Sequence, residues 1–172
     1  MYAEIPSTDI TQPTDTIIGF PNDSDWPPAE APRYAIDNNI NTKYLHYKGE
    51  TQTTGFCVTP TEFHAIVIGL TFTTANDAPD RDPVKFELYG SNDDISGPYT
   101  LIASGDIADF SQTTAWPRYT KNTTPVIFSN SIAYKHYKLV FPAVRNPSGA
   151  NSMQIAEVEL LGQPGGEWPP VV

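Results

Sequence analysis

The chain has 172 residues, with 20 acidic and 10 basic side chains and a formal net charge of −10. This charge repels phosphate backbones and anionic lipid headgroups, so we expect neither nucleic acid nor acidic membranes as partners. Seventeen prolines and eleven glycines accompany 12% aromatic and only 17% charged residues. That composition favours short strands joined by rigid turns over long surface helices, and it predicts an all-β protein.

Short apolar runs bounded by turn residues follow one another along the chain, and each predicts a β-strand. Two of them, "VKFELYGS" and "KHYKLVFPAV", alternate apolar and polar residues with the period of two that is typical of a half-buried strand. No window has a 3.6-residue stripe, and "SGDIADFS" predicts at most one helical turn. The predicted strands cover residues 55–60, 63–75, 84–91, 99–107, 124–130, 135–144 and 154–162.

This spacing of strands predicts two packed antiparallel sheets, a β-sandwich, with a closed barrel as the alternative. The length fits one domain, which we place at residues 1–162, because about 150 residues can bury roughly 70% of their unfolded surface. Residues 163–172 are rich in Gly and Pro and are expected to form a tail or linker. Function is expected on the irregular segments, because a rigid sandwich usually carries its binding residues on loops. The longest of these segments are 21–33, 74–83, 110–123 and 142–152.

The sequence indicates a soluble chain. Its first ten residues have neither a charged start nor an apolar run, and no stretch approaches the roughly 18 apolar residues of a membrane span. The single cysteine, Cys57, cannot form an internal disulfide and is expected to pack as a small hydrophobe. We expect a module from a larger secreted or cell-surface protein.

The sequence gives no positive sign of catalysis. It contains no HExxH, GxSxG, GxGxxG or P-loop motif. Of its three histidines, His64 and His136 fall inside predicted strands, where a histidine on a sheet face is expected, and His46 follows a polar segment. Neighbouring carboxylates such as Asp93 and Asp94 are expected in solvated loops, whereas a glycosidase needs two carboxyls held about 5–10 Å apart across a cleft.

The segment "AIDNNINT" concentrates oxygen-bearing side chains between Asp37 and Thr42. Such crowding suits calcium, which takes six to eight oxygen ligands and accepts backbone carbonyls readily. The alternative is an Asx-type turn, in which Asp37 caps its own backbone and Asn38 or Asn39 adopts a left-handed conformation. The segment is not an EF-hand loop, because the glycine and the distal glutamate of that motif are missing.

Three stretches, in order along the chain, resemble discoidin domains, also called coagulation factor five/eight type C domains. They are "AIDNNINTKYL", "TTANDAPDRDPVKFELYGSND", and "YKLVFPAV" followed by "NSMQIAEVELLG". The resemblance covers about residues 15–162 and is greatest to the bacterial members that include the family 32 carbohydrate-binding modules. The chain departs from that pattern at Asn38, where the family prefers glycine, and at Tyr44, where it more often has tryptophan.

The resemblance implies an eight-stranded, jelly-roll-like sandwich of the galactose-binding-domain type, with its two termini close together. It also implies a structural Ca²⁺ under the loop that follows the first strand. The implied ligands are side chains of Asp37, Thr42 and Glu157, an oxygen of Asn39, and the carbonyls of Tyr34 and Ala156.

In the family 32 modules, the sugar lies on loops at one end of the sandwich. The matching loops here predict the ligand-binding residues Trp26, His46, Asn76, Asp77, Arg81, Asp82, Arg145, Asn146 and Asn151. Several have alternative interpretations: Arg81 and Asp82 as an ion pair that braces their loop, and Trp26 as a lid over the sandwich end. Trp116 is a second candidate platform for stacking, and Trp168 lies in the predicted tail.

Two functions of different class follow from these observations. The first is a non-catalytic carbohydrate-binding module for a neutral oligo- or polysaccharide, a monomer that could be appended to a catalytic domain. The second is an adhesion or structural module that binds a protein partner. An aromatic-plus-polar pocket would favour the first and an exposed apolar loop tip the second.

Overall fold

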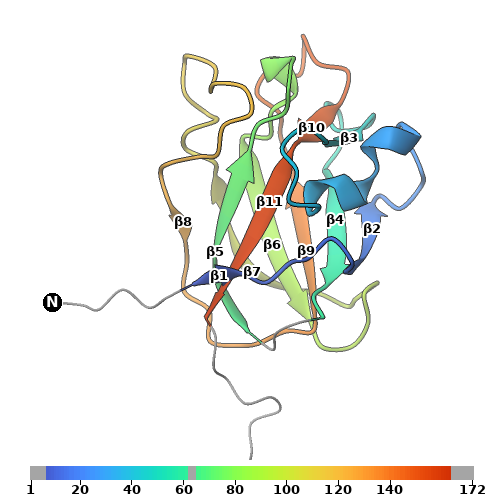
Figure 1. The fold of residues 1–172 in the computed structure, drawn as a ribbon, viewed down its shortest axis with the longest axis vertical. Helices are drawn as coiled ribbons and strands as arrows, with labels where there is room; N and C mark the ends of the chain where they lie inside the picture. The colour runs from blue at the N-terminus through green and yellow to red at the C-terminus, as the bar shows by residue number, and fades with distance from the viewer. Residues whose placement is uncertain (1–6, 62–64, 164–172) are drawn as a thin grey trace, which may run out of the picture.

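Alternating apolar side chains build two antiparallel sheets in the computed structural model, which describes residues 7–61 and 65–163. The first sheet has the strand order β1-β11-β5-β8, with the strands Thr8–Asp9, Glu157–Gln163, Ile66–Thr73 and Val126–Ile127. The second has the order β2-β4-β9-β6-β7, with the strands Thr16–Phe20, Thr54–Thr59, His136–Phe141, Lys85–Ser91 and Thr100–Asp106. A short pair, β3 (Tyr44–His46) with β10 (Met153–Ile155), lies beside them (Figure 1).

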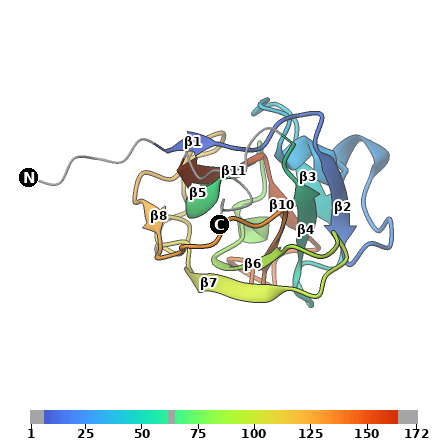
Figure 2. The ribbon, with the colours of Figure 1, turned by 90° about the horizontal axis from the view of Figure 1, so that it is seen from below.

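The core lies between the two sheets. The ring of Phe72 on β5 of the first sheet packs against Phe86 and Phe141 of the second, with ring centroids 6.2 and 6.0 Å apart. All three side chains are buried, as is Phe110, whose ring centroid is 6.4 Å from that of Phe72. Figure 2, which looks along the sandwich from below, shows the strands of the two sheets in separate layers. The sheet-on-sheet packing confirms the predicted β-sandwich.

The period-two pattern correctly assigned the faces of the strands. On β6, Phe86 and Leu88 are buried, Lys85 is exposed and Glu87 is half-buried. The only helices in the described residues are three short 3-10 turns: η1 (Pro28–Glu30), η2 (Pro32–Ala35) and η3 (Pro79–Arg81). Each has a proline in its first turn, where the fixed φ of proline suits the helix and its missing N–H costs nothing. None of the described helices is long and apolar enough to cross a membrane.

Strand boundaries differ from the sequence prediction at both ends of the chain. The predicted strand 154–162 is two strands, β10 and β11, because the chain bends at Ala156 between them and its N–H donates to the Thr73 carbonyl (3.0 Å). The short strands β1, β2 and β3 were not predicted. The predicted strand 124–130 is reduced to the two residues of β8.

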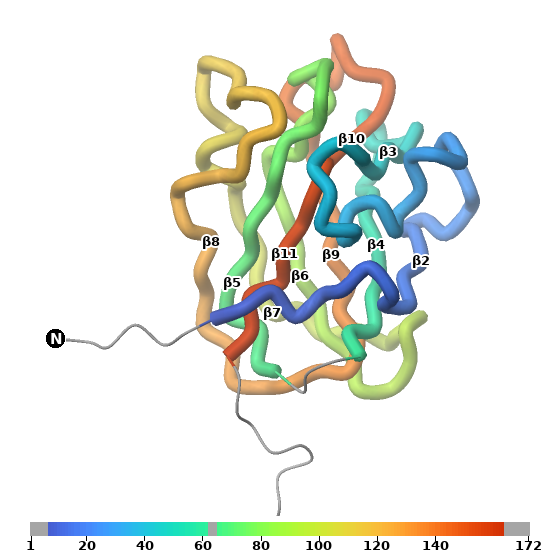
Figure 3. Tube along the Cα trace, in the orientation of Figure 1, coloured from blue at the N-terminus to red at the C-terminus, as the bar shows by residue number. Residues whose placement is uncertain are grey.

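The first and last described strands are neighbours, as the discoidin resemblance implied. Thr8 pairs with Gly162 and Asp9 with Leu161, so the two ends of the described chain leave the sandwich at the same edge (Figure 3). Strand β11 extends through Gln163, and the rest of the predicted tail, with Trp168, lies outside the described residues.

Three loops that are far apart in sequence meet at the opposite end of the sandwich, at the top of Figure 1. The Tyr119 N–H donates to the carbonyl of Ala75 at 3.3 Å, which joins segment 110–123 to segment 74–83. The Asn146 N–H donates to the carbonyl of Asp80 at 3.1 Å, which joins segment 142–152 to the same loop. Segment 74–83 is therefore the centre of this loop end.

The aromatic contact between the sheets is expected to dominate stability. Phe72→Ala should lower the free energy of unfolding by about 3–5 kcal/mol, because it removes a fully buried ring and leaves a cavity. Ile127→Ala is the control: Ile127 is 71% exposed, and its loss should change stability by only about 0.5 kcal/mol. Urea unfolding measures both, and equal losses in the two variants would contradict this account of the core.

Candidate functional site

At the loop end, one lysine gathers several of the predicted ligand-binding residues. The Lys43 ammonium donates to Asn76 Oδ1 at 3.0 Å, to Asp77 Oδ1 at 3.1 Å and to Gln154 Oε1 at 2.9 Å. The side chain of Lys43 is only 12% exposed, whereas that of Asp77 is 55% exposed. Lys43 therefore sits beneath the loop and holds its polar groups in place, while those groups face solvent.

Gln154, on β10, completes this arrangement from below. It is fully buried, and its Nε2 donates to the carbonyl (2.5 Å) and to Oδ1 (3.2 Å) of Asp77. Its Oε1 also accepts from the Arg81 guanidinium at 3.3 Å. Burial opposes ionisation of Asp77, but the hydrogen bonds from Lys43 and Gln154 outweigh it and lower the pKa of this carboxyl. The structure thus brings Asn76, Asp77 and Arg81 together, as predicted, and adds two residues that sequence reasoning missed.

Asp82 has a different partner from the one expected. The sequence suggested an ion pair between Arg81 and Asp82, but the Asp82 carboxylate is bound by both terminal nitrogens of Arg118, with Nη1 to Oδ1 at 2.9 Å. Asp82 is 1% exposed, and this burial raises its pKa against the opposing effect of Arg118. Arg118 also donates to the Asp77 carbonyl (3.1 Å). Asp82 therefore braces the loop and does not face a ligand.

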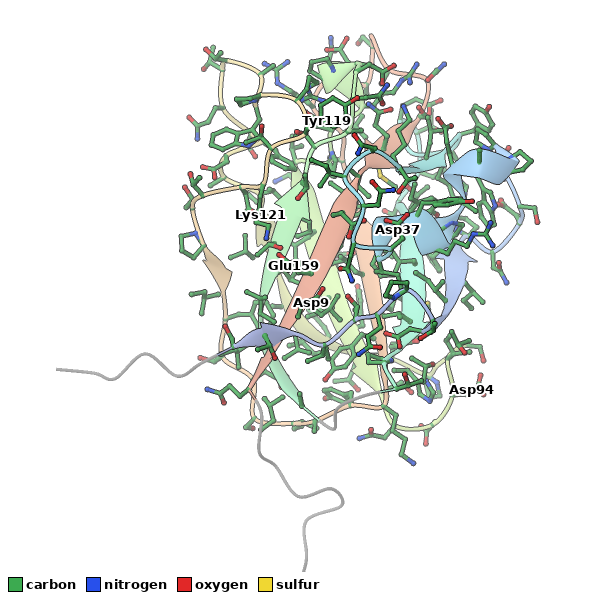
Figure 4. The ribbon with its side chains drawn as sticks, in the orientation of Figure 1. Asp9, Asp37, Asp94, Tyr119, Lys121 and Glu159 are labelled. Atoms are coloured by element: carbon green, nitrogen blue, oxygen red, sulfur yellow. The ribbon has the colours of Figure 1, made fainter. Side chains whose placement is uncertain are left out.

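The exposed aromatic residue at this end is Tyr119, labelled in Figure 4. It follows Arg118, is 45% exposed and has φ 55°, a left-handed conformation that is uncommon for a bulky residue. Such backbone strain is found where the surrounding structure imposes it, often at ligand-binding positions. Sequence reasoning weighed Trp116 in this segment instead, but Trp116 is half-buried against Phe110, with ring centroids 6.4 Å apart.

Arg145 and Asn146 line a separate pocket of about 360 Å³ beside this surface, together with Val84, Ser111 and Gln112. The Arg145 guanidinium donates to the Thr113 carbonyl at 2.8 Å, while its Nε is buried and has no hydrogen-bond partner among the described residues. Asn146 is exposed. The exposed Asn151 lies further along the same loop, and its Oδ1 accepts from the Ser152 hydroxyl (2.9 Å).

Trp26 and His46 lie apart from this surface and pack on each other. Their ring centroids are 5.6 Å apart, and each also packs edge-on against the buried Tyr44. His46 is fully buried, with Nε2 3.1 Å from the Pro21 carbonyl oxygen and Nδ1 accepting from the Lys48 N–H (3.2 Å). The alternative interpretation of Trp26 as a lid fits this packing, and Tyr44 is a buried core aromatic.

The oxygen-rich segment forms a second cluster, against β11. The Glu157 carboxylate accepts from the N–H groups of Asn38 (3.3 Å) and Asn39 (3.2 Å). The Thr42 hydroxyl donates to the Asp37 carboxylate and lies 3.0 Å from the Asn39 carbonyl oxygen. Asn38 has φ 58°, the left-handed conformation that the family's glycine would adopt readily. Two acidic side chains 120 positions apart in sequence are thus held side by side.

Ionisation of both carboxylates in this cluster is disfavoured. Burial, and then the neighbouring Asp37 carboxylate, raise the pKa of Glu157 to about 9. Asp37 is labelled in Figure 4, beside β11. Tyr34 lies in η2, three residues before Asp37, and Ala156 lies in the bend directly before Glu157. The described residues contain no group of three or more His, Cys, Asp or Glu side chains that could hold a metal ion. In this cluster there are two carboxylates, with hydroxyl and carbonyl oxygens around them.

Sequence comparison finds no relative, whereas comparison of structures finds many. No protein-family model matches the chain, and no curated protein matches it in sequence. In structure it is similar to the family 32 module of NanJ from Clostridium perfringens in complex with galactose, with a TM-score of 0.63 and 19% identity over 91% of this chain and 99% of that one.

Two further structures show the same likeness. The module CpGH89CBM32-5 from Clostridium perfringens, in complex with GalNAc-β-1,3-galactose, gives a TM-score of 0.64 and 15% identity over 90% of this chain and 99% of that one. A fucolectin from striped bass (Morone saxatilis) serum gives a TM-score of 0.60 and 16% identity over 91% of this chain and 49% of that one. The chain therefore has the discoidin-like β-sandwich fold of the family 32 carbohydrate-binding modules.

Proposed function

We propose that the chain is a non-catalytic carbohydrate-binding module that holds a neutral glycan at its loop end. The observation that carries this proposal is the exposed Tyr119, whose N–H is bonded to the carbonyl of Ala75, on the same loop as amide, carboxylate and guanidinium groups that are already held in place. A sugar ring offers a C–H face to an aromatic side chain and hydroxyls to directional polar groups. Asn76, Asp77 and Arg81 are the polar contacts that we propose.

Preorganisation makes this surface suited to binding. Fixing a mobile side chain on binding costs about 0.5–1.5 kcal/mol, so contact groups that are fixed beforehand preserve affinity. Lys43 and Gln154 fix Asn76 and Asp77 from beneath, and Arg118 fixes the loop from segment 110–123. A small module can therefore bind a sugar without rearranging its loops.

The pocket of Arg145 and Asn146 would extend the surface for a longer glycan. It adjoins the first surface through the backbone hydrogen bond between Asn146 and Asp80. Its polar groups include the exposed amide of Asn146. We propose that a second sugar unit of an oligo- or polysaccharide occupies it.

The comparisons support a sugar as the ligand class. Two of the similar structures were solved with galactose and with GalNAc-β-1,3-galactose. Another contains two family 32 modules with the M60 catalytic domain of ZmpB from Clostridium perfringens, and this chain covers 14% of it. We infer a module of a secreted or cell-surface protein, where it could serve a catalytic domain.

The side chains at the loop end favour this function over the adhesion alternative. The most exposed large hydrophobics of the described strands are Ile127 on β8 (71%) and Leu101 on β7 (53%). Both lie on strands at the edges of the two sheets. Two further isoleucines are exposed outside the strands, Ile132 (47%) between β8 and β9 and Ile40 (45%) in the loop of the cation cluster. At the loop end, the exposed large side chain is a tyrosine with polar neighbours, which suits a sugar better than an apolar protein surface.

We further propose that Asp37, Thr42, Glu157 and an oxygen of Asn39 bind a structural Ca²⁺, with the carbonyls of Tyr34 and Ala156. The residues fit a hard cation, because two carboxylates, a hydroxyl and a carbonyl already converge. Burial, and then the neighbouring Asp37 carboxylate, raise the pKa of Glu157, and a divalent cation would oppose both effects by favouring the ionised form. The cation would tie the loop after β2 to strand β11.

Glycan binding is tested with two equally exposed tyrosines. In the presence of Ca²⁺, the wild-type protein should bind at least one galactose-containing glycan on an array. Tyr119→Ala should weaken that affinity about fivefold by calorimetry, because stacking contributes on the order of 1 kcal/mol. Tyr47→Ala removes a tyrosine of equal exposure from the β3–β4 turn and should leave affinity unchanged. Retention of no glycan, or equal affinity in Tyr119→Ala and wild type, would contradict the proposed site.

Calcium binding is tested with two glutamates of β11. A hundredfold excess of Ca²⁺ over its Kd should stabilise the wild-type protein by about 2.7 kcal/mol, a rise in Tm of several degrees that chelator reverses. Glu157→Gln should abolish the rise. Glu159→Gln should keep it, because the Glu159 carboxylate lines the same pocket but is already paired with Lys121 and Thr71. Metal analysis that finds no calcium, with no change in Tm, would leave the segment as an Asx turn.

The pH dependence of the metal-free protein has a defined sign. Because the pKa of Glu157 is raised from 4.5 to about 9 on folding, the native state binds one more proton than the unfolded state between these values. Stability in chelator should therefore fall as pH rises from about 5 to 9. The stability of Glu157→Gln should fall less over this range, because only the wild type has this titrating group beside Asp37. Urea unfolding at several pH values measures the difference, and identical slopes would exclude the raised pKa.

A further inference from the structure

Lys43 connects the cation cluster to the proposed sugar-binding loop. It follows Thr42 directly in the chain, and the Thr42 hydroxyl bonds to the Asp37 carboxylate. The Lys43 ammonium reaches in the other direction, to Asn76 and Asp77 at 3.0 and 3.1 Å. One peptide bond therefore separates a proposed Ca²⁺ ligand from the residue that positions two proposed sugar contacts.

Gln154 makes a second connection between the cation cluster and the proposed sugar-binding loop, from the Glu157 side. It lies three residues before Glu157, and its side chain bonds to Lys43, to Arg81 and to both the carbonyl and the carboxylate of Asp77. Between Gln154 and Glu157 the chain is held at Ala156 by a hydrogen bond to Thr73. Strand β10, which carries Gln154, pairs with β3 directly after Lys43. The two segments that carry Asp37 and Glu157 thus also carry Lys43 and Gln154, which hydrogen-bond to the proposed sugar-binding loop.

We propose that Lys43 and Gln154 are positioning residues that couple cation binding to glycan binding, so that Ca²⁺ at Asp37 and Glu157 increases affinity for the sugar. This inference rests on the function proposed above and specifies its regulation. The coupling is thermodynamic and reciprocal: the glycan must also increase affinity for Ca²⁺.

The physical cause of the coupling is that a bound cation fixes the segments of Thr42 and Glu157. Without it, the N–H groups of Asn38 and Asn39, at 3.3 and 3.2 Å from the Glu157 carboxylate, are the hydrogen bonds that tie the loop to β11, and they are weaker than coordination of a shared cation. Lys43 has an alternative acid nearby, because its ammonium is also 3.7 Å from Glu30. If residue 43 shifts, the ammonium can exchange Asn76 and Asp77 for Glu30, and the sugar contacts lose their fixed positions. A cation that fixes Thr42 and Glu157 favours the arrangement that presents Asn76 and Asp77.

The test compares Lys43→Met with Lys48→Met. The first variant keeps an unbranched apolar stem and removes the ammonium from the network. The second removes a half-exposed ammonium that pairs with Asp23 and Asp25 and has no contact with the network or the cation cluster among the described residues. For each protein, the affinity for the best array glycan is measured by calorimetry with Ca²⁺ and with chelator, and the rise of Tm with Ca²⁺ is measured without glycan.

The wild type and Lys48→Met should bind the glycan about tenfold more tightly with Ca²⁺ than with chelator, within the usual range of coupling between sites. Lys43→Met should bind it more weakly, with less than about twofold difference between the two conditions, yet keep its rise of Tm with Ca²⁺. This combination separates a positioning role from a merely stabilising one. Equal affinity of the wild type in both conditions, despite a rise of Tm, would overturn the proposal, as would full coupling in Lys43→Met.

A readout without glycan keeps the test decisive if the proposed function is wrong. Hydrogen exchange of residues 74–83 should slow on Ca²⁺ addition in the wild type and not in Lys43→Met. Unchanged exchange of this loop in the wild type, in a protein whose Tm rises with Ca²⁺, would overturn the coupling independently of any sugar. Absence of array binding, with the expected change in exchange, would instead reject the sugar and keep the coupling.

Discussion

The arrangement of this molecule depends on one electrostatic constraint: two carboxylates from distant parts of the chain, Asp37 and Glu157, are held against each other near the surface. Strand β11, which carries Glu157, lies in the middle of its sheet between β1 and β5 and cannot move freely. The early loop must therefore conform to it, and two backbone N–H groups of that loop do so by donating to Glu157. A protein that brings like charges together must compensate them with a proton or a cation.

This constraint also determines how the residues of the loop end are positioned. The position of the early loop sets the position of Lys43, and Lys43 with Gln154 sets Asn76 and Asp77. Arg118 fixes the same loop independently through the buried Asp82 carboxylate, and the next residue, Tyr119, is exposed to solvent. The loop end thus rests on two ionic groups with little exposure, Lys43 and Asp82, and each is paired, which is the condition under which such groups can be tolerated.

Much of the fold was predictable, because the alternation in "VKFELYGS" and "YKLVFPAV" reports directly which side chains face the core. The split of residues 154–162 at Ala156 was not, since nothing in "QIAEVELLG" interrupts its strand-like pattern. In the candidate site, Asp37 and Glu157 were paired only through the family resemblance. Asp82 was assigned the wrong arginine, because the true partner, Arg118, is 36 residues away.

Tyr119 shows a different limit. Sequence reasoning searched for tryptophan platforms, and each described tryptophan packs against core aromatics: Trp26 on Tyr44 and Trp116 on Phe110. The only local signal for Tyr119 was an aromatic residue two positions after a proline in a long irregular segment, which does not by itself indicate exposure. Its exposure is set by the contact of its backbone with Ala75, which no local pattern contains.

The most direct test of the account is a crystal structure of the protein grown with Ca²⁺ and soaked with a pool of galactose-containing oligosaccharides. The account predicts a sugar ring over Tyr119 with hydroxyls within hydrogen-bonding distance of Asn76, Asp77 or Arg81. A sugar bound elsewhere, for example in the groove of about 350 Å³ that Trp26 lines beside β2, with the loop end empty, would contradict it.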